Sequence, residues 1–349
     1  MFHDVPGPSS RPLDFKKRLQ QNNGAQWSGD ELTMGDKHIK PSTGTARTGR
    51  RSNAVGVVGL GIMGGAIARN LLRAGYEVVG FDPDPKRRSE AQEAGVAIMK
   101  STTPVAAAAD RVLTSLPNPE ALDETTRAIA DLSESERQGL VIAELSTFSM
   151  DSKLRNRDVL ADIGVAMLDC PLSGTGAQAE VGDLVVYASG DAAAFARCEG
   201  VFSGFARAIR YLGDFGKGTK MKLVANLLVA IHNVAAAEAI LLGVKAGLDP
   251  DTLCDVLGSG AGGSRMFDMR APLMVKEEFE PATMKLDVWK KDMALIRELA
   301  ESCGVVTPVF SATAPLYDAA IAAGRGHEDT AAVYEVLKEI SGRSGKSEE

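Results

Sequence analysis

The feature that most constrains the fold is one long apolar segment, residues 216–247, with the sequence GKGTKMKLVANLLVAIHNVAAAEAILLGVKAG. The segment opens on a glycine-rich turn, and Thr219 is of a type that caps helix starts. No proline interrupts it, and Gly247 is a typical helix stop. The pattern predicts one helix over residues 218–247, about 45 Å long at about 1.5 Å per residue.

Apolar side chains follow this predicted helix in two stripes. The first consists of Leu223, Leu227, Ala230, Val234, Ala237, Leu241 and Val244, and the second of Val224, Leu228, Ile231, Ala235 and Leu242. Two stripes predict a helix that is buried on more than one side. Either the other C-terminal helices of this chain or those of a partner copy must cover it.

Two polar residues, Lys222 and Asn226, interrupt the apolar wrapping one turn apart on a shared face. A lysine on a buried helix costs free energy unless it is paired or used in chemistry. The pair is therefore the first candidate for a catalytic site. The plain alternative is a lysine whose head group reaches water from a helix end.

Composition narrows the class of protein. The chain has 349 residues, enough for two domains, and a net charge of -7, which gives no reason to expect nucleic acid as a partner. Its four cysteines show no CxxC spacing, so we expect buried thiols in a reducing compartment and no metal site. No apolar run reads as a membrane span or secretory segment, and we expect a cytoplasmic protein without a membrane partner.

Residues 1–53 differ from the rest of the chain. They are rich in Pro, Gly, Ser, Thr and basic residues and poor in apolar ones, a composition typical of a disordered extension. The mild basic excess also fits a targeting or nucleic-acid arm, and Met34 is another possible start. A short tail is expected at residues 342–349.

The folded part is predicted to begin at Ala54, with the apolar strand 54–59 and then GLGIMGGAIARNLLRAG at residues 59–75. Glycines in a GxGxxG pattern between a strand and a helix make a tight turn, admit a pyrophosphate and let the helix pack on the strand. The helix N-terminus then faces the phosphates. The candidate cofactor-binding residues here are Gly59, Leu60, Gly61, Ile62, Met63 and Gly64.

The next strand, residues 76–81, ends at Asp82. An acidic residue at this place accepts hydrogen bonds from the adenosine ribose and repels a 2′-phosphate, which favours NAD over NADP. The basic run 86–88 follows closely and could hold that phosphate, so NADP stays open.

Strands and helices continue to alternate to residue 215, which predicts a parallel sheet covered by helices. Strands are expected at residues 95–99, 111–116, 140–144, 165–169, 185–189 and 208–212, with helices at 103–109, 120–131, 151–163 and 192–202. Ligands of such sheets lie beyond the carboxyl ends of the strands, where Leu116, Pro117, Ser146, Thr147 and the turn 171–176 fall.

The remainder is predicted to be helical, with no strand. The expected helices are 249–258, 264–275, 282–302, 308–323 and 328–341. The architecture is then an N-terminal Rossmann-type α/β domain over residues 54–215 and an all-α C-terminal domain over residues 216–341, which includes the long linking helix.

Four motifs occur in an order that resembles the β-hydroxyacid dehydrogenase family, which includes 3-hydroxyisobutyrate and threonate-type dehydrogenases. They are GLGIMGGAIARNLLRAGY, DCPLSGTGAQAEVGDL, GKGTKMKLVANLL and WKKDMAL. The resemblance spans residues 54–340. It implies an NAD(P)-dependent oxidoreductase that interconverts a small 3-hydroxy acid and its oxo or semialdehyde form, working as a homodimer or homotetramer.

The resemblance also assigns roles residue by residue. Lys222 would be the acid/base group, and Asn226 would hydrogen-bond the reacting hydroxyl. Substrate-binding residues would be Ser173, Gly174 and Thr175, and further cofactor contacts would come from Leu116, Pro117, Thr147 and Lys291. We expect Lys222→Ala to lower turnover by orders of magnitude while NAD(H) binding survives.

Thr175 departs from the family pattern, which has a second glycine there, so the preferred acid can differ from 3-hydroxyisobutyrate. The C-terminal half resembles the threonate-dehydrogenase-like branch. Two alternatives share the architecture, namely imine reductases, which usually carry another residue at the lysine position, and non-catalytic dinucleotide-binding relatives that have lost the lysine.

Overall fold

The computed structural model describes residues 53–343. The predicted N-terminal extension, apart from Asn53, and the last six residues of the predicted tail lie outside the described residues. Asn53 already belongs to the folded part, because its side-chain amide donates to the Gly75 carbonyl at 2.7 Å.

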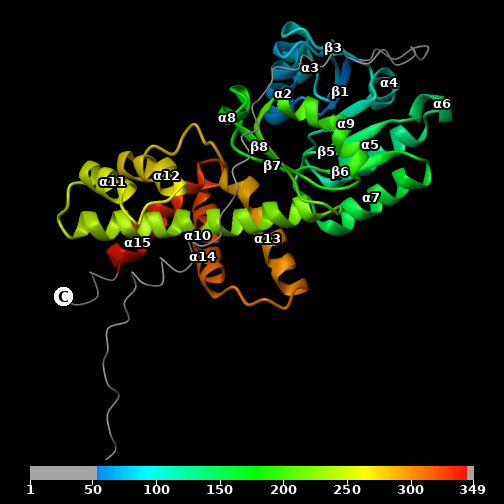
Figure 1. Cartoon of the computed structure of the whole chain (residues 1–349). Helices are drawn as coiled ribbons and strands as arrows, with labels where there is room; N and C mark the ends of the chain where they lie inside the picture. The colour runs from blue at the N-terminus through cyan, green and yellow to red at the C-terminus, as the bar shows by residue number, and fades with distance from the viewer. Residues whose placement is uncertain (1–52, 344–349) are drawn as a thin grey trace, which may run out of the picture. The chain divides into compact units, whose positions relative to one another are not determined.

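A parallel sheet forms the core of the N-terminal half (Figure 1). It has six strands in the order β3-β2-β1-β4-β5-β6. This is the strand order of dinucleotide-binding folds, in which the topology reverses between β1 and β4. The strands are β1 (Ala54–Val58), β2 (Glu77–Phe81), β3 (Ala97–Ile98), β4 (Arg111–Thr114), β5 (Val141–Glu144) and β6 (Ala166–Asp169). The predicted α/β class and parallel sheet are confirmed.

Helices cover both faces of this sheet, which explains why β1 and β5 are continuous buried runs rather than alternating ones. Side chains of α2 and α9 join one core, and those of α4, α5 and α7 join the core on the opposite face. The helices are α2 (Ile62–Arg73), α3 (Pro85–Glu93), α4 (Thr102–Ala108), α5 (Pro119–Ala130), α6 (Glu134–Arg137), α7 (Met150–Asp162) and α9 (Ala192–Ser203).

A second, three-stranded sheet follows and was not expected as a separate sheet. It consists of β7 (Leu172–Ser173), β8 (Leu184–Ala188) and β9 (Ala206–Tyr211), with the short helix α8 (Gly176–Glu180) between β7 and β8. The β7–β8 pair is antiparallel, because the chain reverses through α8 and Gly182, whose φ of 71° is left-handed. Two-residue β7 and five-residue α8 are too short to give a periodic signal in the sequence.

The long helix α10 (Lys217–Lys245) ends as predicted, with Gly247 at a φ of 86°. Gly243 lets α11 approach closely, since a Cβ there would lie 2.6 Å from the Leu253 side chain. The predicted cap is wrong. Gly216 is the N-cap, and Thr219 lies inside the first turn, where its hydroxyl donates to Asp169.

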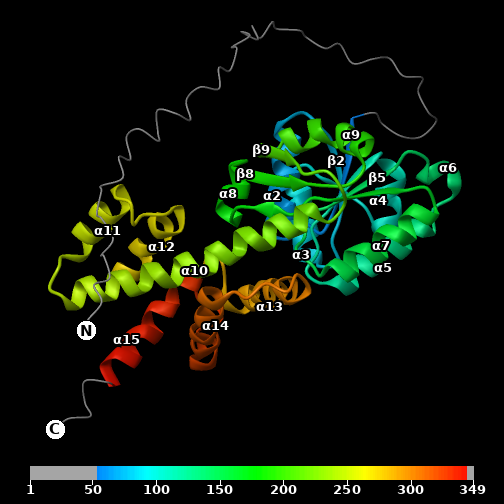
Figure 2. The ribbon, with the colours of Figure 1, turned by 60° about the horizontal axis from the view of Figure 1, so that its bottom comes forward.

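Five further helices pack around α10, with α11 and α12 on one side and α13, α14 and α15 on the other (Figure 2). Their large buried side chains include Phe267, Trp289, Phe310 and Tyr317. The helices are α11 (Pro250–Ser259), α12 (Arg265–Lys276), α13 (Leu286–Ser302), α14 (Pro308–Ala320) and α15 (Val333–Arg343), with a π turn (Ile321–Arg325) and a 3₁₀ turn (Thr330–Ala332) before α15. Gly324, at a φ of 84°, breaks the helix that was predicted to run to residue 323.

The second apolar stripe of α10 is not buried by this chain. Val224, Leu228 and Leu242 are 54%, 49% and 73% exposed, so the prediction of burial on more than one side fails within the single chain. By length and composition α10 is also the one helix of residues 53–343 that could cross a membrane, which corrects the expectation that no run would qualify. α10 packs against five other helices, so its length and apolar composition are accounted for by its position in the core of the helical half.

Candidate active site

A cavity of about 730 Å³ opens at the switch point between β1 and β4, beyond the carboxyl ends of the strands. This is where such sheets bind ligands. Its lining includes the predicted residues Gly59, Gly61, Ile62, Met63, Asp82, Leu116 and Pro117. Leu60 and Gly64, also predicted, are buried behind this surface.

The three motif glycines are required for different reasons. Gly59 has a φ of 89°, and a Cβ there would lie 2.1 Å from the Ser115 carbonyl. A Cβ on Gly64 would lie 1.9 Å from the Gly59 carbonyl, so this glycine permits the close packing of α2 on β1. Gly61 has no atom within 4 Å of its Cβ position, which leaves its outer side open for a ligand.

The first turn of α2 lies at this open side and has no side-chain cap. Its free amides and the positive end of the helix dipole form an anion site. A cavity of this size, lined by the first turn of α2, fits a dinucleotide such as NAD(P).

Asp82 is held rigidly in the wall of the cavity. Its Oδ2 accepts from the Leu60 amide at 2.7 Å and its Oδ1 from the Asp84 amide at 2.8 Å. Of the basic run after β2, Arg87 lines the cavity, whereas Arg88 donates to the Asp82 carbonyl at 2.7 Å and so supports the turn.

The predicted substrate turn lies against the start of α2. A Cβ on Gly176 would lie 2.6 Å from the Ile62 side chain, and Arg69 of α2 forms an ion pair with Glu180 of α8. Thr175 is the N-cap of α8 in a capping box with Gln178, whose Oε1 accepts from the Thr175 amide at 3.0 Å. The turn that contains Ser173, Gly174 and Thr175 is thus next to the phosphate site.

Lys222 and Asn226 lie on α10, facing α13. Lys222 is half-buried, and Asn226 is buried and donates from Nδ2 to Asp292 Oδ2 at 2.8 Å. Burial lowers the pKa of Lys222, an effect that Asp292 opposes and Lys291 reinforces. The neutral amine is therefore more accessible near neutral pH than for an exposed lysine.

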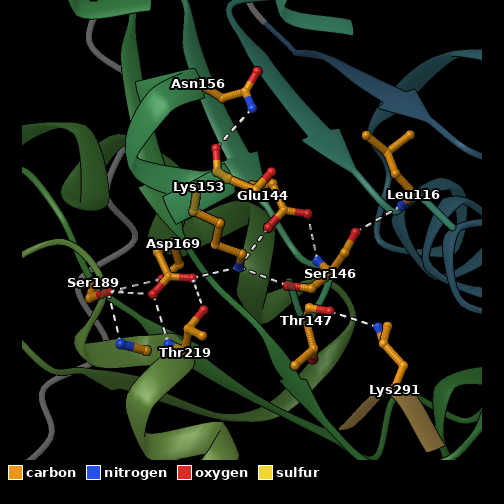
Figure 3. A network of polar contacts seen from close by, with 12 residues as sticks. Leu116, Glu144, Ser146, Thr147, Lys153, Asn156, Asp169, Ser189, Thr219 and Lys291 are labelled. Atoms are coloured by element: carbon orange, nitrogen blue, oxygen red, sulfur yellow. Dashed lines mark hydrogen bonds and ion pairs between the residues drawn. The ribbon is translucent and has the colours of Figure 1, made fainter. Parts of the chain in front are cut away.

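Lys291 connects this cluster to the cofactor side of the sheet. Its Nζ donates to the Thr147 carbonyl at 2.6 Å, beyond the end of β5 (Figure 3). The same Nζ lies 3.5 Å from Asp292 Oδ1. The same ammonium is 5.4 Å from the ring centre of Phe148. The predicted cofactor residues Thr147 and Lys291 are thus in direct contact.

Sequence reasoning missed several residues of this region. One of them is Asp292, which directly follows Lys291 in the WKKDMAL motif. Its position next to a predicted cofactor residue is the signal in the sequence that could have identified it. Among residues 53–343, its buried Oδ1 accepts no hydrogen bond and has the Lys291 ammonium 3.5 Å away as an ion-pair partner. The other missed group is a buried polar network around Lys153, which only the fold brings together.

Two family models match the chain in sequence. The NAD binding domain of 6-phosphogluconate dehydrogenase matches residues 54–213, and the NAD-binding model of NADP-dependent 3-hydroxyisobutyrate dehydrogenase matches residues 216–337. Together they cover the α/β half and most of the helical half.

The matches to individual relatives span nearly the whole length of those relatives. The chain is 33% identical to L-threonate dehydrogenase from Cupriavidus necator (85% of this chain, 100% of the relative) and 30% identical to 2-(hydroxymethyl)glutarate dehydrogenase from Eubacterium barkeri (84% and 98%). The solved structure of Mycobacterium tuberculosis 3-hydroxyisobutyrate dehydrogenase with L-serine has a TM-score of 0.74 and 29% identity, and covers 82% of this chain and 99% of that one.

An imine reductase from Pseudomonas sp. shares only the fold, at 18% identity and a TM-score of 0.52 over 82% of this chain and all of that one. The relatives are named as dehydrogenases of hydroxy acids, and both family models are NAD-binding domains of such dehydrogenases. The chain therefore belongs to the β-hydroxyacid dehydrogenase family and is an NAD(P)-dependent hydroxyacid dehydrogenase.

Proposed function

We propose that Lys222 is the acid/base group for the interconversion of a small 3-hydroxy acid and its oxo form. The observation that carries this proposal is the half-buried Lys222 beside Asn226 and Asp292, with its pKa lowered by burial. An amine of lowered pKa accepts a proton from the substrate hydroxyl during oxidation and returns it during reduction.

Asn226 and Asp292 orient the same hydroxyl. Asn226 uses one N–H on Asp292, and its second N–H can donate to the substrate oxygen. Because this hydrogen bond fixes the amide plane, the donor is positioned before the substrate arrives. NAD(P), held by the first turn of α2 and the motif glycines, supplies the hydride acceptor.

The substrate carboxylate is assigned to the turn of Ser173, Gly174 and Thr175. Gly174 has a φ of 142°, a conformation that favours glycine, and α8 begins two residues later at Gly176. The Thr175 hydroxyl and amide are both engaged in capping α8, so its methyl group, rather than a free hydroxyl, shapes the pocket. The L-threonate dehydrogenases among the relatives make a 3-hydroxy acid with further hydroxyls the first choice of substrate.

We propose NAD as the preferred cofactor. The Asp82 carboxylate is fixed at the end of β2, where an adenosine ribose would meet it, and its charge opposes a 2′-phosphate. Asp82→Ala should weaken NAD binding and reduce the discrimination against NADP, as measured by the ratio of kcat/KM values. An unchanged ratio would argue against this role.

The activity test is an initial-rate assay of nicotinamide absorbance on the purified full chain. The panel is L-threonate, D-threonate, 3-hydroxyisobutyrate, D-glycerate, L-serine and 3-hydroxypropionate, each with NAD and with NADP. One acid turned over well with NAD supports both proposals. A preference for NADP would overturn the role of Asp82, and no turnover with cofactor bound would overturn this substrate class.

We also propose that the exposed stripe of α10 packs against a second copy of the chain, as a homodimer or a homotetramer built from such pairs. Val224, Leu228 and Leu242 recur with helical spacing and are about half exposed or more. Leu228→Asp should shift the sedimentation coefficient toward that of a monomer, whereas a wild-type monomer would contradict the assembly. The four free cysteines support a cytoplasmic setting.

A further inference from the structure

Lys153 is a fully buried lysine that the proposed reaction does not use. It lies on α7, with Nζ at 2.6 Å from Glu144 Oε2 and 2.6 Å from Asp169 Oδ1. The same Nζ donates to the Ser146 carbonyl at 2.7 Å (Figure 3). The ammonium is thus held by hydrogen bonds to Asp169 and Ser146 and by an ion pair with Glu144.

A buried ion pair of this kind rarely stabilises a fold more than apolar side chains of the same shape would. Burial raises the pKa of Glu144, and although burial opposes it, the charges of Asp169 and Glu144 raise the pKa of Lys153. Lys153 thus stays charged. The network has two arms, one through Glu144 and one through Asp169, and it fixes the geometry of the groups that these two carboxylates bind.

The first arm holds the cofactor side of the site. Glu144 ends β5, and its Oε1 accepts from the Ser146 amide at 2.7 Å. Ser146 Oγ in turn accepts from the Leu116 amide at 2.8 Å, and Leu116 lines the cofactor cavity. The ends of β4 and β5 are thus joined through Glu144.

The second arm holds the start of the catalytic helix. Asp169 ends β6, and its Oδ2 accepts from the Thr219 amide at 2.7 Å and its Oδ1 from the Thr219 hydroxyl at 2.6 Å. Ser189 Oγ accepts from the Gly218 amide at 2.9 Å. Because the N-cap Gly216 has no side chain, Asp169 at the end of β6 and Ser189 just after β8 cap α10 instead.

The start of α10 has no room to move in this arrangement. A Cβ on Gly218 would lie 2.3 Å from the Tyr187 carbonyl and 2.7 Å from the Asp169 carbonyl. Lys222 follows Thr219 by three residues, less than one helical turn. The direction of its side chain is therefore set by how the first turn is seated on Asp169.

We propose that Lys153 is a positioning residue for Lys222: by joining Glu144 to Asp169, it fixes the first turn of α10 relative to the cofactor side of the sheet. The proposal rests on the proposed role of Lys222. Among residues 53–343, the hydrogen bonds and ion pairs of Lys153 are with Glu144, Asp169 and Ser146, so it acts on α10 and on the cavity wall through these groups.

The first test is Lys153→Met, which removes the charge and keeps the length of the side chain. Single-turnover hydride transfer, followed by nicotinamide absorbance, should slow about 100-fold, as expected for a catalytic group misplaced by about 1 Å. The loss should fall on kcat and leave KM and the Kd for NADH unchanged. The matched control is Arg155→Met on the same helix, whose exposed side chain pairs with Asp123 at 3.3 Å and which should behave as wild type.

The second test is Thr219→Val, which removes the hydroxyl donor to Asp169 and keeps the shape. It should slow hydride transfer in the same direction but less, and the double variant should be no slower than Lys153→Met alone, because both break one connection. Additive rate losses, or a wild-type rate in folded Lys153→Met, would overturn the proposal. If Lys153→Met does not fold, Thr219→Val decides alone: a lower kcat with unchanged KM supports the proposal and a wild-type kcat overturns it.

A third measurement needs no substrate and separates this proposal from the proposed function. Lys222 of the apo protein is acetylated across a pH series, and its labelling is quantified by mass spectrometry, with exposed Lys245 as the internal reference. The groups that face Lys222 from α13, Asp292 and Lys291, are unchanged in every variant. Lys153→Met should move the labelling midpoint of Lys222 toward that of Lys245, and an unmoved midpoint would overturn the positioning role even if no hydroxy acid is turned over.

Discussion

Gly61→Ala, at the start of α2, should weaken cofactor binding while leaving the stability of the fold nearly unchanged. The φ of Gly61 is -66°, which alanine adopts readily, and no atom lies within 4 Å of the added Cβ. Less freedom in the unfolded chain stabilises the variant by about 0.4–1 kcal/mol, while alanine is a poorer N-cap than glycine by a similar amount. The two effects offset, so the free energy of unfolding should change by less than about 1 kcal/mol, or under about 4 °C in Tm.

Cofactor affinity should respond much more strongly to the same change. The open side of Gly61 faces the cavity, where the pyrophosphate approaches the α2 amides. A methyl group there displaces the phosphate from one hydrogen bond to a charged group, worth about 1.5–3 kcal/mol. The Kd for NADH should therefore rise about 10- to 150-fold, since about 1.4 kcal/mol corresponds to a factor of ten.

The assay is a titration of NADH fluorescence together with thermal unfolding of the same samples. Gly262→Ala is the matched control, because its Cβ also meets no atom within 4 Å but lies in the loop between α11 and α12, and it should change neither property. Gly64→Ala is the opposite control, because its Cβ would overlap the Gly59 carbonyl and should lower Tm. A wild-type NADH affinity in Gly61→Ala would refute the assignment of the phosphate site.

Two further predictions concern charge. Lys291 lowers the pKa of Lys222 and Asp292 raises it. In a pH profile of the oxidation rate, Lys291→Met should therefore move the rising limb to higher pH, and Asp292→Asn should move it to lower pH. Shifts of the same sign would contradict this electrostatic account. Arg270 is buried and lies 3.2 Å from buried Asp329, so Arg270→Met should destabilise the protein by about 3–5 kcal/mol in urea unfolding, and a change under about 1 kcal/mol would show that the pair matters little.

Much of the fold follows from local patterns in the sequence. The GxGxxG motif at 59–64 has few conformational solutions, and its required backbone geometry is seen at Gly59 and Gly64. The regular alternation of strands and helices predicted the parallel sheet. Gly247 was predicted to end the long helix, and it has the left-handed backbone conformation that is typical of a glycine at a helix C-terminus.

The features that the sequence could not predict depend on distant parts of the chain. Glu144, Lys153 and Asp169 are separated along the chain and meet only because β5, β6 and α7 are neighbours in the sheet layer. Thr219 was predicted to be a helix cap from its residue type alone. Its hydroxyl instead binds Asp169, which lies 50 residues earlier and could not be paired with it from the sequence. On α7 the sequence does carry a signal, because Lys153 and Asn156 share one helical face with the apolar Leu160, which marks that face as buried.

The α10 stripe shows a different limit. An apolar pattern predicts that a face is covered but not by which chain. The sequence left open whether this chain or a partner copy covers the second stripe, and within this chain Val224, Leu228 and Leu242 remain exposed. The pairing of Lys291 with Thr147 also needed the fold, because 144 residues separate them.

The most direct test of the central claim is single-turnover hydride transfer by Lys222→Met, with the best acid of the panel and saturating NAD. Methionine keeps the length of the side chain and removes the group that accepts the proton. The rate should fall about 100- to 10,000-fold, the usual contribution of a general base, while the Kd for NADH stays at the wild-type value. A rate within a few-fold of wild type would show that another group moves the proton and would contradict the account given for Lys222.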